Sequence, residues 1–455
     1  MKKHERERER ERDRSLPRNV IIVGGSLSGL MHGIMLHRLG NTVRIFEQSL
    51  THTPASHMAG VCLGLDVQHF LKRFDLIPER PLGIQSVQLQ SLDENGQANP
   101  FLPVNRIMSS WDALYFRLRA NFDMRSSEYV PHPPELDSLA GEGAESARAR
   151  ARYEVGKQVT GVEQLKTGQI AVRYKDHEDG GKEAQALADL VLGADGPNSI
   201  VRKSLLEPGQ ADRKYTGYVA WRGVVSEEQV SEETREVFGA NITYSILKEG
   251  VGHVIVYYIP GKGGSIEPGK RLLNFCWYTN VTGSPLDSTM TDIDGTRHHT
   301  KLPAGQARPE VWEAQKAKAS TLFASPYLDI IENIKLPFVH LITDYCSPRA
   351  SFAGGKVLLV GDALTLLRPH TASSTSQAAY HALLTEELVT GRLTREEWEY
   401  KVTTVAYLQW RRSAWFGEYF QRPLYRSIGS GILFWAAAAL AKMRSWMGWL
   451  PPQEV

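Results

Sequence analysis

A glycine-rich turn behind a hydrophobic segment is the part of this sequence best suited to bind a phosphate group. Asn19–Val23 is a short β-branched run, and Gly24, Gly25, Ser26 and Gly29 follow it directly. A turn that ends a strand and opens a helix presents backbone N–H groups and the positive helix end to a pyrophosphate. We expect the first glycine to make the tight turn and the last to let the helix pack closely on the strand. A serine replaces the second glycine of GxGxxG, so the motif alone is weak.

An acidic residue follows this turn at the distance that a dinucleotide site requires. Residues 30–39 predict a helix, residues 42–46 predict a second strand, and Glu47 stands at its end. A carboxylate at the tip of the second strand of a βαβ unit accepts hydrogen bonds from ribose hydroxyls. The region therefore predicts a site for an adenine dinucleotide, with an ordinary loop as the alternative for the turn taken alone.

Two later segments resemble the second and third fingerprints of the flavoprotein aromatic hydroxylases. The sequence GADGPNSIVR contains Asp195 and Gly196, and the sequence VGDA contains Gly361 and Asp362, with Pro369 after it. Together with the first turn, they span most of the chain in the order and spacing of that family. The segments SWDALY, YVAWRG and RPHTA resemble the branch that contains 2,6-dihydroxypyridine 3-monooxygenase.

The resemblance implies a para-hydroxybenzoate hydroxylase fold with tightly bound FAD and with NADPH or NADH as reductant. That fold is a mixed α/β architecture: a Rossmann-like FAD-binding domain, an inserted antiparallel-sheet substrate domain and C-terminal helices. The resemblance also implies that a flavin C4a-hydroperoxide transfers oxygen from O2 to an electron-rich ring carbon. On this basis we expect an FAD-dependent monooxygenase that hydroxylates a small aromatic or heteroaromatic molecule.

The resemblance assigns the cofactor-binding residues to the three motifs and to the loop after the third. They are Gly24, Gly25, Ser26, Gly29, Glu47, Asp195, Gly196, Gly361, Asp362, Pro369, Thr371, Ala372, Ser373 and Ser374. Asp362 is expected to bind a ribityl hydroxyl, with a helix cap as the alternative, and the loop is expected to face the N1–C2=O edge of the flavin. Ser374 stands where relatives have a glycine, and Thr365 where many have a histidine. Arg202 is either a pyrophosphate partner or a surface charge.

Candidates for the substrate pocket lie on the inserted sheet and after the second strand. They are Arg222, Tyr218 and His57, each with a structural or surface role as the alternative. His253 and three aromatic residues, Trp221, Tyr257 and Trp277, are further candidates on the same sheet. The three cysteines are far apart and show no metal-ligand spacing, so we expect no metal site.

Hydrophobic patterning predicts the order of the elements and a division into domains. A helix is expected over residues 111–122, strands over 190–192 and 356–360, and a helix over 375–388. Alternating segments at 218–225, 241–247, 253–259 and 272–278 predict an antiparallel sheet. The predicted domains are a charged tail (1–18), an FAD-binding domain (19–80, 100–205 and 340–400), a substrate domain (81–99 and 206–339) and a C-terminal helical region (401–455). Residues 126–152 read as a surface insertion.

The charge balance argues against nucleic acid as a partner. The chain of 455 residues has a net charge of +2, and the alternating Glu-Arg tail accounts for that excess. The tail predicts a disordered leader or a short charged helix, and it lacks the apolar core of a secretory signal, so a cytoplasmic location is expected. From Gly429 to Met443 an apolar run predicts a helix packed on the protein or at a homodimer contact, with peripheral membrane contact as the alternative.

Two other functions remain open from the sequence. One keeps the fold and changes the chemistry to epoxidation, oxidative rearrangement or demethylation of a natural product. The other is a weakly active flavin-binding accessory protein, motivated by Ser374, Thr365 and the apolar C-terminal run.

Overall fold

A parallel sheet carries the first turn. The computed structural model describes residues 17–52, 59–134, 150–247 and 252–446. Its six-stranded sheet has the order β17 (Ser351–Phe352), β18 (Val357–Leu359), β10 (Leu190–Gly193), β1 (Asn19–Val23), β2 (Thr42–Phe46) and β6 (Ala151–Glu154). All neighbours are parallel except β17 and β18, and the central strands are short buried runs, as a sheet covered on both faces requires. The predicted βαβ unit is confirmed, with α2 (Leu27–Arg38) starting earlier than expected.

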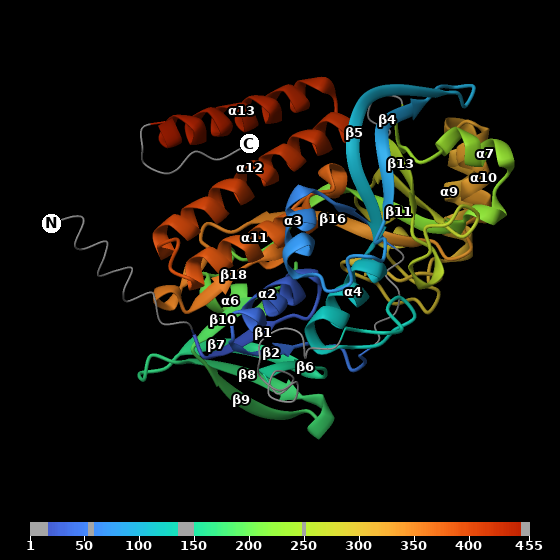
Figure 1. The fold of residues 1–455 in the computed structure, drawn as a ribbon. Helices are drawn as coiled ribbons and strands as arrows, with labels where there is room; N and C mark the ends of the chain where they lie inside the picture. The colour runs from blue at the N-terminus through green and yellow to red at the C-terminus, as the bar shows by residue number, and fades with distance from the viewer. Residues whose placement is uncertain (1–16, 53–58, 135–149, 248–251, 447–455) are drawn as a thin grey trace.

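A larger, mainly antiparallel sheet lies beside it (Figure 1). Its order is β15 (Lys301–Leu302), β16 (Phe338–Cys346), β11 (Lys214–Ser226), β14 (Leu272–Asn280), β13 (Gly252–Ile259), β12 (Ile242–Ile246), β4 (Ile84–Leu92), β5 (Ala98–Ser110) and β3 (Gly60–Leu63). The tenth strand, β19 (Thr365–Leu366), pairs with β16. All four strands predicted between residues 218 and 278 are present, and they are central neighbours in this sheet.

Four strands pair differently from the predicted division of the chain. The sequence ranges predicted for the FAD-binding domain contain β3, β19 and most of β5 and β16, but all four strands hydrogen-bond within the ten-stranded sheet. The long strand β5 lies between β4 and β3 in that sheet and leads directly into α4 (Trp111–Asp123). The division into domains itself stays a prediction.

Helices cover both sheets. They are α2, α3 (Leu65–Phe74), α4, α6 (Ile200–Leu205), α7 (Glu232–Phe238), α8 (Ser284–Thr289), α9 (Pro309–Leu322), α10 (Ser325–Asn333), α11 (Ser374–Val389), α12 (Arg395–Gln421) and α13 (Leu424–Trp446). A third sheet contains β7 (Lys157–Gln164), β8 (Ile170–Asp176) and β9 (Lys182–Ala188). In Figure 1, α12 crosses the molecule above α11, and α13 lies on the outer side of α12. Most of the predicted tail and of the predicted insertion falls outside the described residues.

Candidate active site

The glycine turn is fixed by close backbone approaches. Gly24 has a φ of +99°, and a Cβ there would lie 2.5 Å from the carbonyl oxygen of Ala194 on the neighbouring strand connection. A Cβ on Gly29 would collide with the backbone oxygen of Gly24, so the helix can approach the turn only through a glycine. A Cβ on Gly25 would collide with the ring of Tyr153. Glycine at these three positions therefore permits the tight turn and the close approach of α2 to it.

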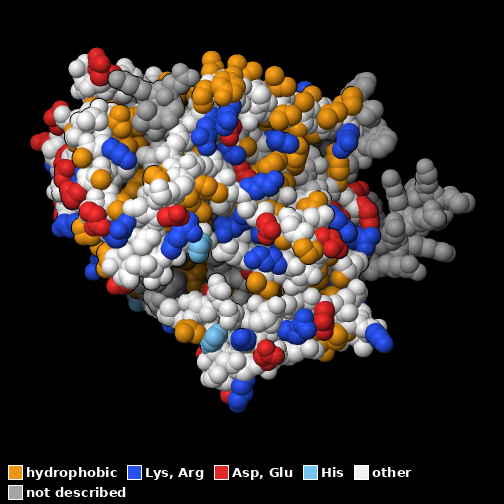
Figure 2. Space-filling view, turned by 180° about the vertical axis from the view of Figure 1, so that it is seen from behind, with side chains coloured by type: hydrophobic (Ala, Val, Ile, Leu, Met, Phe, Trp, Pro, Cys, Tyr) orange, Lys and Arg blue, Asp and Glu red, His pale blue; other side chains and the backbone are white. Residues whose placement is uncertain are grey.

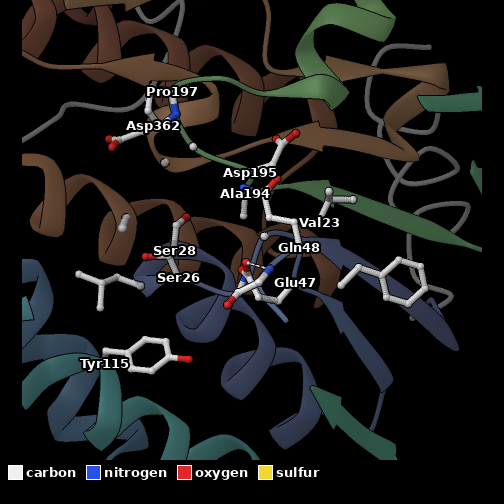
Figure 3. A pocket seen from close by; sticks show the side chains of 18 of the residues that line it. Val23, Ser26, Ser28, Glu47, Gln48, Tyr115, Ala194, Asp195, Pro197 and Asp362 are labelled. Carbon is white, nitrogen blue, oxygen red and sulfur yellow. Dashed lines mark hydrogen bonds between the residues drawn. The ribbon is translucent and has the colours of Figure 1, made fainter. Parts of the chain in front are cut away.

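A cavity of about 630 Å³ opens in front of this turn. Figure 3 shows carboxylates around it: Glu47 at the end of β2, Asp195 after β10, and Asp362 after β18. Cavities of this size are typical of sites for large organic ligands. Because these strands are parallel, their carboxyl ends meet at one edge of the sheet, and this brings together motifs that are more than 300 residues apart.

The first two carboxylates are held by backbone N–H groups. Glu47 accepts one hydrogen bond from the N–H of Gly25 and one from the N–H of Ser49, each at 2.9 Å. Asp195 accepts hydrogen bonds from the Ser199 hydroxyl at 2.5 Å and from the N–H of Ile200 at 2.7 Å. Asp195 therefore orders the loop that leads into α6.

The third carboxylate has no hydrogen-bond partner among the described residues. Asp362 follows Gly361, whose φ of +57° and whose Cβ position, 2.7 Å from the Ser28 hydroxyl, both favour glycine. Burial raises the pKa of Asp362 to about 6, and the charge of Arg202 partly opposes that rise. Asp362 is half-buried and faces the cavity, so it is well placed to accept a hydrogen bond from a hydroxyl-bearing ligand. This cradle fits FAD: the turn would hold its pyrophosphate, and Asp362 its ribityl chain.

Arg202 has neither of the roles that the sequence suggested. Its side chain is buried, does not line the cavity, and donates to the carbonyl oxygens of Pro197, Ala211 and Ala363 at 2.7, 3.1 and 2.8 Å. The guanidinium also lies 4.1 Å from the centre of the Tyr345 ring. Arg202 therefore ties the second and third motifs together. The sequence gives no signal for this, because the contacts come from distant segments.

The loop after the third motif joins the first cavity to a second one. Pro369 and Ala372 line the second cavity, while Ser374 and Thr375, at the start of α11, line both. Ala372 has a φ of +51°, which turns the loop into the helix. The positive end of α11 thus lies where the two cavities meet, a position that stabilises negative charge.

The second cavity has a volume of about 160 Å³ and lies against the ten-stranded sheet. Its polar and charged lining residues include Arg106, Arg222, Tyr244, Tyr257, Tyr278 and His340. Arg222 projects from β11; its Nε is buried without a hydrogen-bond partner, and its guanidinium lies 5.6 Å from the centre of the Phe338 ring. Burial raises the pKa of Tyr244 to about 12, so this phenol stays neutral, and its hydroxyl donates to the carbonyl oxygen of His370 at 3.3 Å.

Other sequence candidates lie elsewhere. Tyr218 does not line either cavity; its hydroxyl lies 2.7 Å from Nε2 of His370, behind the loop. His253 is also behind the loop, with its Nε2 3.3 Å from Nδ1 of His370. Trp221 and Trp277 are packed in the hydrophobic core of the large sheet, the plain core role left open by the sequence. His57 lies outside the described residues.

The remaining pocket residues were missed because strand register was not predicted. Arg106 is on β5, Tyr244 on β12 and Tyr278 on β14, and only the observed pairing brings their side chains to one face. The alternation of apolar and polar residues predicted that each strand contributes one face to a common sheet surface. It did not predict which strands are neighbours.

Comparison with known proteins supports the same assignment. A family described as FAD binding domain-like matches residues 215–344. The chain is 31% identical over 378 residues to 2,6-dihydroxypyridine 3-monooxygenase of Paenarthrobacter nicotinovorans, covering 82% of each protein. It is 24% identical to 6-hydroxynicotinate 3-monooxygenase of Pseudomonas fluorescens, covering 79% of each. The solved structure of 2,6-dihydroxypyridine-3-hydroxylase from Arthrobacter nicotinovorans matches with a TM-score of 0.73 and 28% identity, over 89% of this chain and 93% of that one.

The chain belongs to the FAD-dependent aromatic hydroxylases. The predicted resemblance, fold and enzyme class are therefore confirmed: this hydroxylase is a monooxygenase that uses FAD, NAD(P)H and O2. When bound, FAD supplies the activation of O2 and the transfer of oxygen. The residues that line the two cavities would hold the cofactor and the reacting ring and exclude water.

Four buried histidines predict how the stability of this hydroxylase depends on pH. Burial lowers the pKa of His32 to about 4 and the pKa values of His253 and His381 to about 3, and it lowers that of His370 strongly. The unfolded chain binds a proton at each of these sites below about pH 6.5, and the folded chain does not. Each histidine therefore lowers the free energy of unfolding as the pH falls from about 6.5 towards the pKa of that histidine in the folded protein.

His381 allows this pH dependence to be measured at a single site. Its Nδ1 accepts the N–H of Gly361 at 3.0 Å, and the amide oxygen of an asparagine can accept in its place. Between pH 6 and 4, H381N should reduce the slope of the unfolding free energy against pH by about 1.4 kcal/mol per unit. Urea unfolding at several pH values gives this slope. Equal slopes in the two proteins would contradict a neutral His381.

Proposed function

We propose that this enzyme hydroxylates a small, single-ring aromatic or heteroaromatic compound bound as its anion. The observation that carries the proposal is Arg222, a partly buried cation in the second cavity that has no carboxylate partner among the described residues. A buried charge without a counter-ion is costly, so a substrate with a phenolate or carboxylate would bind there favourably. Arg106 lines the same cavity and adds to its positive charge.

The size of the cavity supports a single ring. A volume of about 160 Å³ leaves little room beyond one ring and its substituents. Arg222 can pair with an anionic oxygen of the substrate, and the neutral phenol of Tyr244 adds no opposing charge there. Negative charge on the ring raises the electron density of the carbon that is hydroxylated. The pocket would therefore prepare the ring for oxygen transfer as well as bind it.

Binding of para-nitrophenol tests this proposal directly, because only its ionised form absorbs strongly in the visible range. We expect binding to lower the pKa of the probe by about one unit or more, so that colour intensifies when enzyme is added at mildly acidic pH. The methyl ether of the probe is the matched neutral control, and it should bind more weakly. Loss of colour on binding would mean that the pocket selects the neutral phenol, and it would contradict the proposal.

The cavity that each residue lines determines its role in this proposal. Glu47, Asp195, Gly196, Asp362 and the turn of Gly24 to Gly29 would hold FAD, and the loop from Pro369 to Ser374 would lie at its reacting ring. Arg222 would contact substrate, while Tyr218 would support the loop through His370. His57 stays a prediction from sequence.

Same-fold chemistry on a natural product is the second candidate. The chain is 26% identical to Aurachin C monooxygenase/isomerase of Stigmatella aurantiaca, over 63% of this chain and 70% of that protein, and this similarity supports oxidative rearrangement. The small second cavity favours hydroxylation of a single ring. We also propose a cytoplasmic location, where NAD(P)H is available, and we leave a homodimer as a prediction.

A further inference from the structure

The last helix exposes an apolar face that nothing in the described structure covers. On α13, eight large hydrophobic side chains are between 48% and 69% exposed. They are Leu424, Tyr425, Ile428, Ile432, Leu433, Trp435, Leu440 and Met443, and we call them the outer face of α13. In Figure 2, hydrophobic side chains gather along the upper edge of the molecule, where α13 lies in Figure 1, with Lys and Arg side chains beside them.

The opposite side of α13 packs on α12. Ser427 and Gly431 are buried there, and a Cβ on Gly431 would lie 2.9 Å from Nε1 of Trp415. The ring of Phe434 stacks on the ring of Trp415 with 5.6 Å between their centres. By length and composition, Leu424–Arg444 could cross a membrane, and 11% of its 18-residue apolar stretch is buried in the protein. These contacts hold α13 alongside α12, with its axis parallel to the surface of the protein. The outer face of α13 therefore points away from the protein.

Basic side chains border the outer face on both sides. The three charged residues of α13 are Arg426, Lys442 and Arg444; all are exposed, and the helix contains no Asp or Glu. At about 100° per residue, Arg426 and Arg444 lie at the same angle around the helix, and Lys442 lies about 160° away. The apolar residues fill the arc between them. An apolar strip with cations at its edges is the pattern of a helix that lies in the interface of a bilayer.

We propose that the outer face of α13 rests on an anionic lipid surface. Its apolar side chains would enter the boundary between headgroups and acyl chains, and its three cations would contact lipid phosphates or carboxylates. The aromatic rings of Tyr425 and Trp435 suit this boundary, where such rings are enriched. This inference does not depend on the substrate proposed above.

A second copy of the chain fits this face less well. In an antiparallel two-fold pairing centred on Trp435, Arg426 of one copy lies opposite Arg444 of the other. In a parallel two-fold pairing the edge with Arg444 lies beside the edge with Lys442 of the other copy. Both arrangements place like charges together, and α13 offers no carboxylate to relieve them. Charge complementarity therefore favours an anionic membrane.

Co-sedimentation of the full-length, FAD-loaded protein with vesicles tests the proposal. We expect the protein to pellet with vesicles of phosphatidylcholine and phosphatidylserine at 3:1, and much less with phosphatidylcholine alone. Binding should weaken at 0.5 M salt, because salt screens the cations. The triple variant R426Q/K442Q/R444Q should lower partitioning about 100-fold.

A matched variant separates the position of the charges from their number. K175Q/K318Q/K335Q removes three exposed cations from β8, α9 and the segment after α10, and it should bind the vesicles like the wild type. I432E alters the outer face and should also lose binding, whereas I293E alters another exposed isoleucine, 53% exposed against 63% for Ile432, and should not. Flavin absorbance and NADPH oxidation should be unchanged in all of them, which shows that each is folded.

Four results would overturn the proposal. The first is no pelleting of the wild type with either vesicle, and the second is equal pelleting with both. The third is a wild-type dimer that I432E dissociates without any lipid binding, because the face would then join two copies. The fourth is protein in cell membranes that resists extraction with alkaline carbonate, which would show a helix that spans the bilayer.

Discussion

Replacing Asp362 with alanine should give a protein that is largely colourless after purification. Asp362 is the carboxylate of the first cavity that has no hydrogen-bond partner within the described part of the chain, and it follows Gly361, where a side chain would clash with Ser28. A hydrogen bond to a charged group contributes about 1.5–3 kcal/mol, so we expect the affinity for FAD to fall about 10- to 100-fold. The ratio of flavin to protein absorbance, followed by titration with FAD, measures the loss.

Because Asp362 is ionisable, the affinity of the protein for FAD should also depend on pH. Burial raises the pKa of this carboxyl to about 6 in the unliganded protein. Below that pH the group is protonated and accepts hydrogen bonds poorly, so the affinity of the wild type for FAD should fall as the pH drops through about 6. D362N cannot titrate, and its affinity should stay flat over this range. D212A removes an exposed carboxylate that lines neither cavity, and it should retain FAD. Full FAD in D362A would contradict the assigned role.

Replacing Arg222 with glutamine should weaken substrate binding while leaving the flavin in place. Arg222 lines the second cavity and is absent from the lining of the first. The substitution removes the charge from a partly buried site that pairs with an anionic ring, so KM for a phenolate or carboxylate substrate should rise about 10- to 100-fold. R222K retains the positive charge but lacks the planar guanidinium, so its KM should lie between the values of the wild type and R222Q.

The FAD content of R222Q distinguishes weaker substrate binding from misfolding. R222Q should contain as much FAD as the wild type, and its NADPH oxidation without substrate should be unchanged. R173Q alters an exposed arginine on β8; it is the matched control and should retain the wild-type KM. An unchanged KM in R222Q would remove Arg222 from the substrate site and would weaken the proposal of an anionic substrate.

Local sequence patterns predicted the cofactor half of the molecule well. The strand, turn and helix at residues 19–38 are adjacent in sequence, so residue type and spacing are enough to define them. The later motifs follow β10 and β18, and the rule that parallel strands end at one edge brings them to the same cavity. The glycine conformations at Gly24 and Gly361 are local as well.

The substrate half depends on pairings that are not local. Arg106 reaches the second cavity because β5 joins the large sheet through β4, and β4 is paired with β12 about 150 residues later. Tyr218 and Arg222 are on the same strand, four residues apart, yet only Arg222 lines the cavity, because the loop around His370 covers Tyr218. Alternation predicted the strands but could not give their register or the position of the covering loop.

Rapid mixing of the anaerobic, FAD-loaded enzyme with NADPH or NADH tests whether this hydroxylase acts on an anionic single ring. The mixing is done with and without a panel of hydroxypyridines, phenols and their methyl ethers, and absorbance of the oxidised flavin reports its reduction. We expect an ionisable single-ring compound to accelerate reduction and to be hydroxylated when O2 is admitted, whereas its methyl ether should do neither. Reduction that no panel member accelerates, or that neutral ethers accelerate equally, would contradict an anionic single-ring substrate in the second cavity.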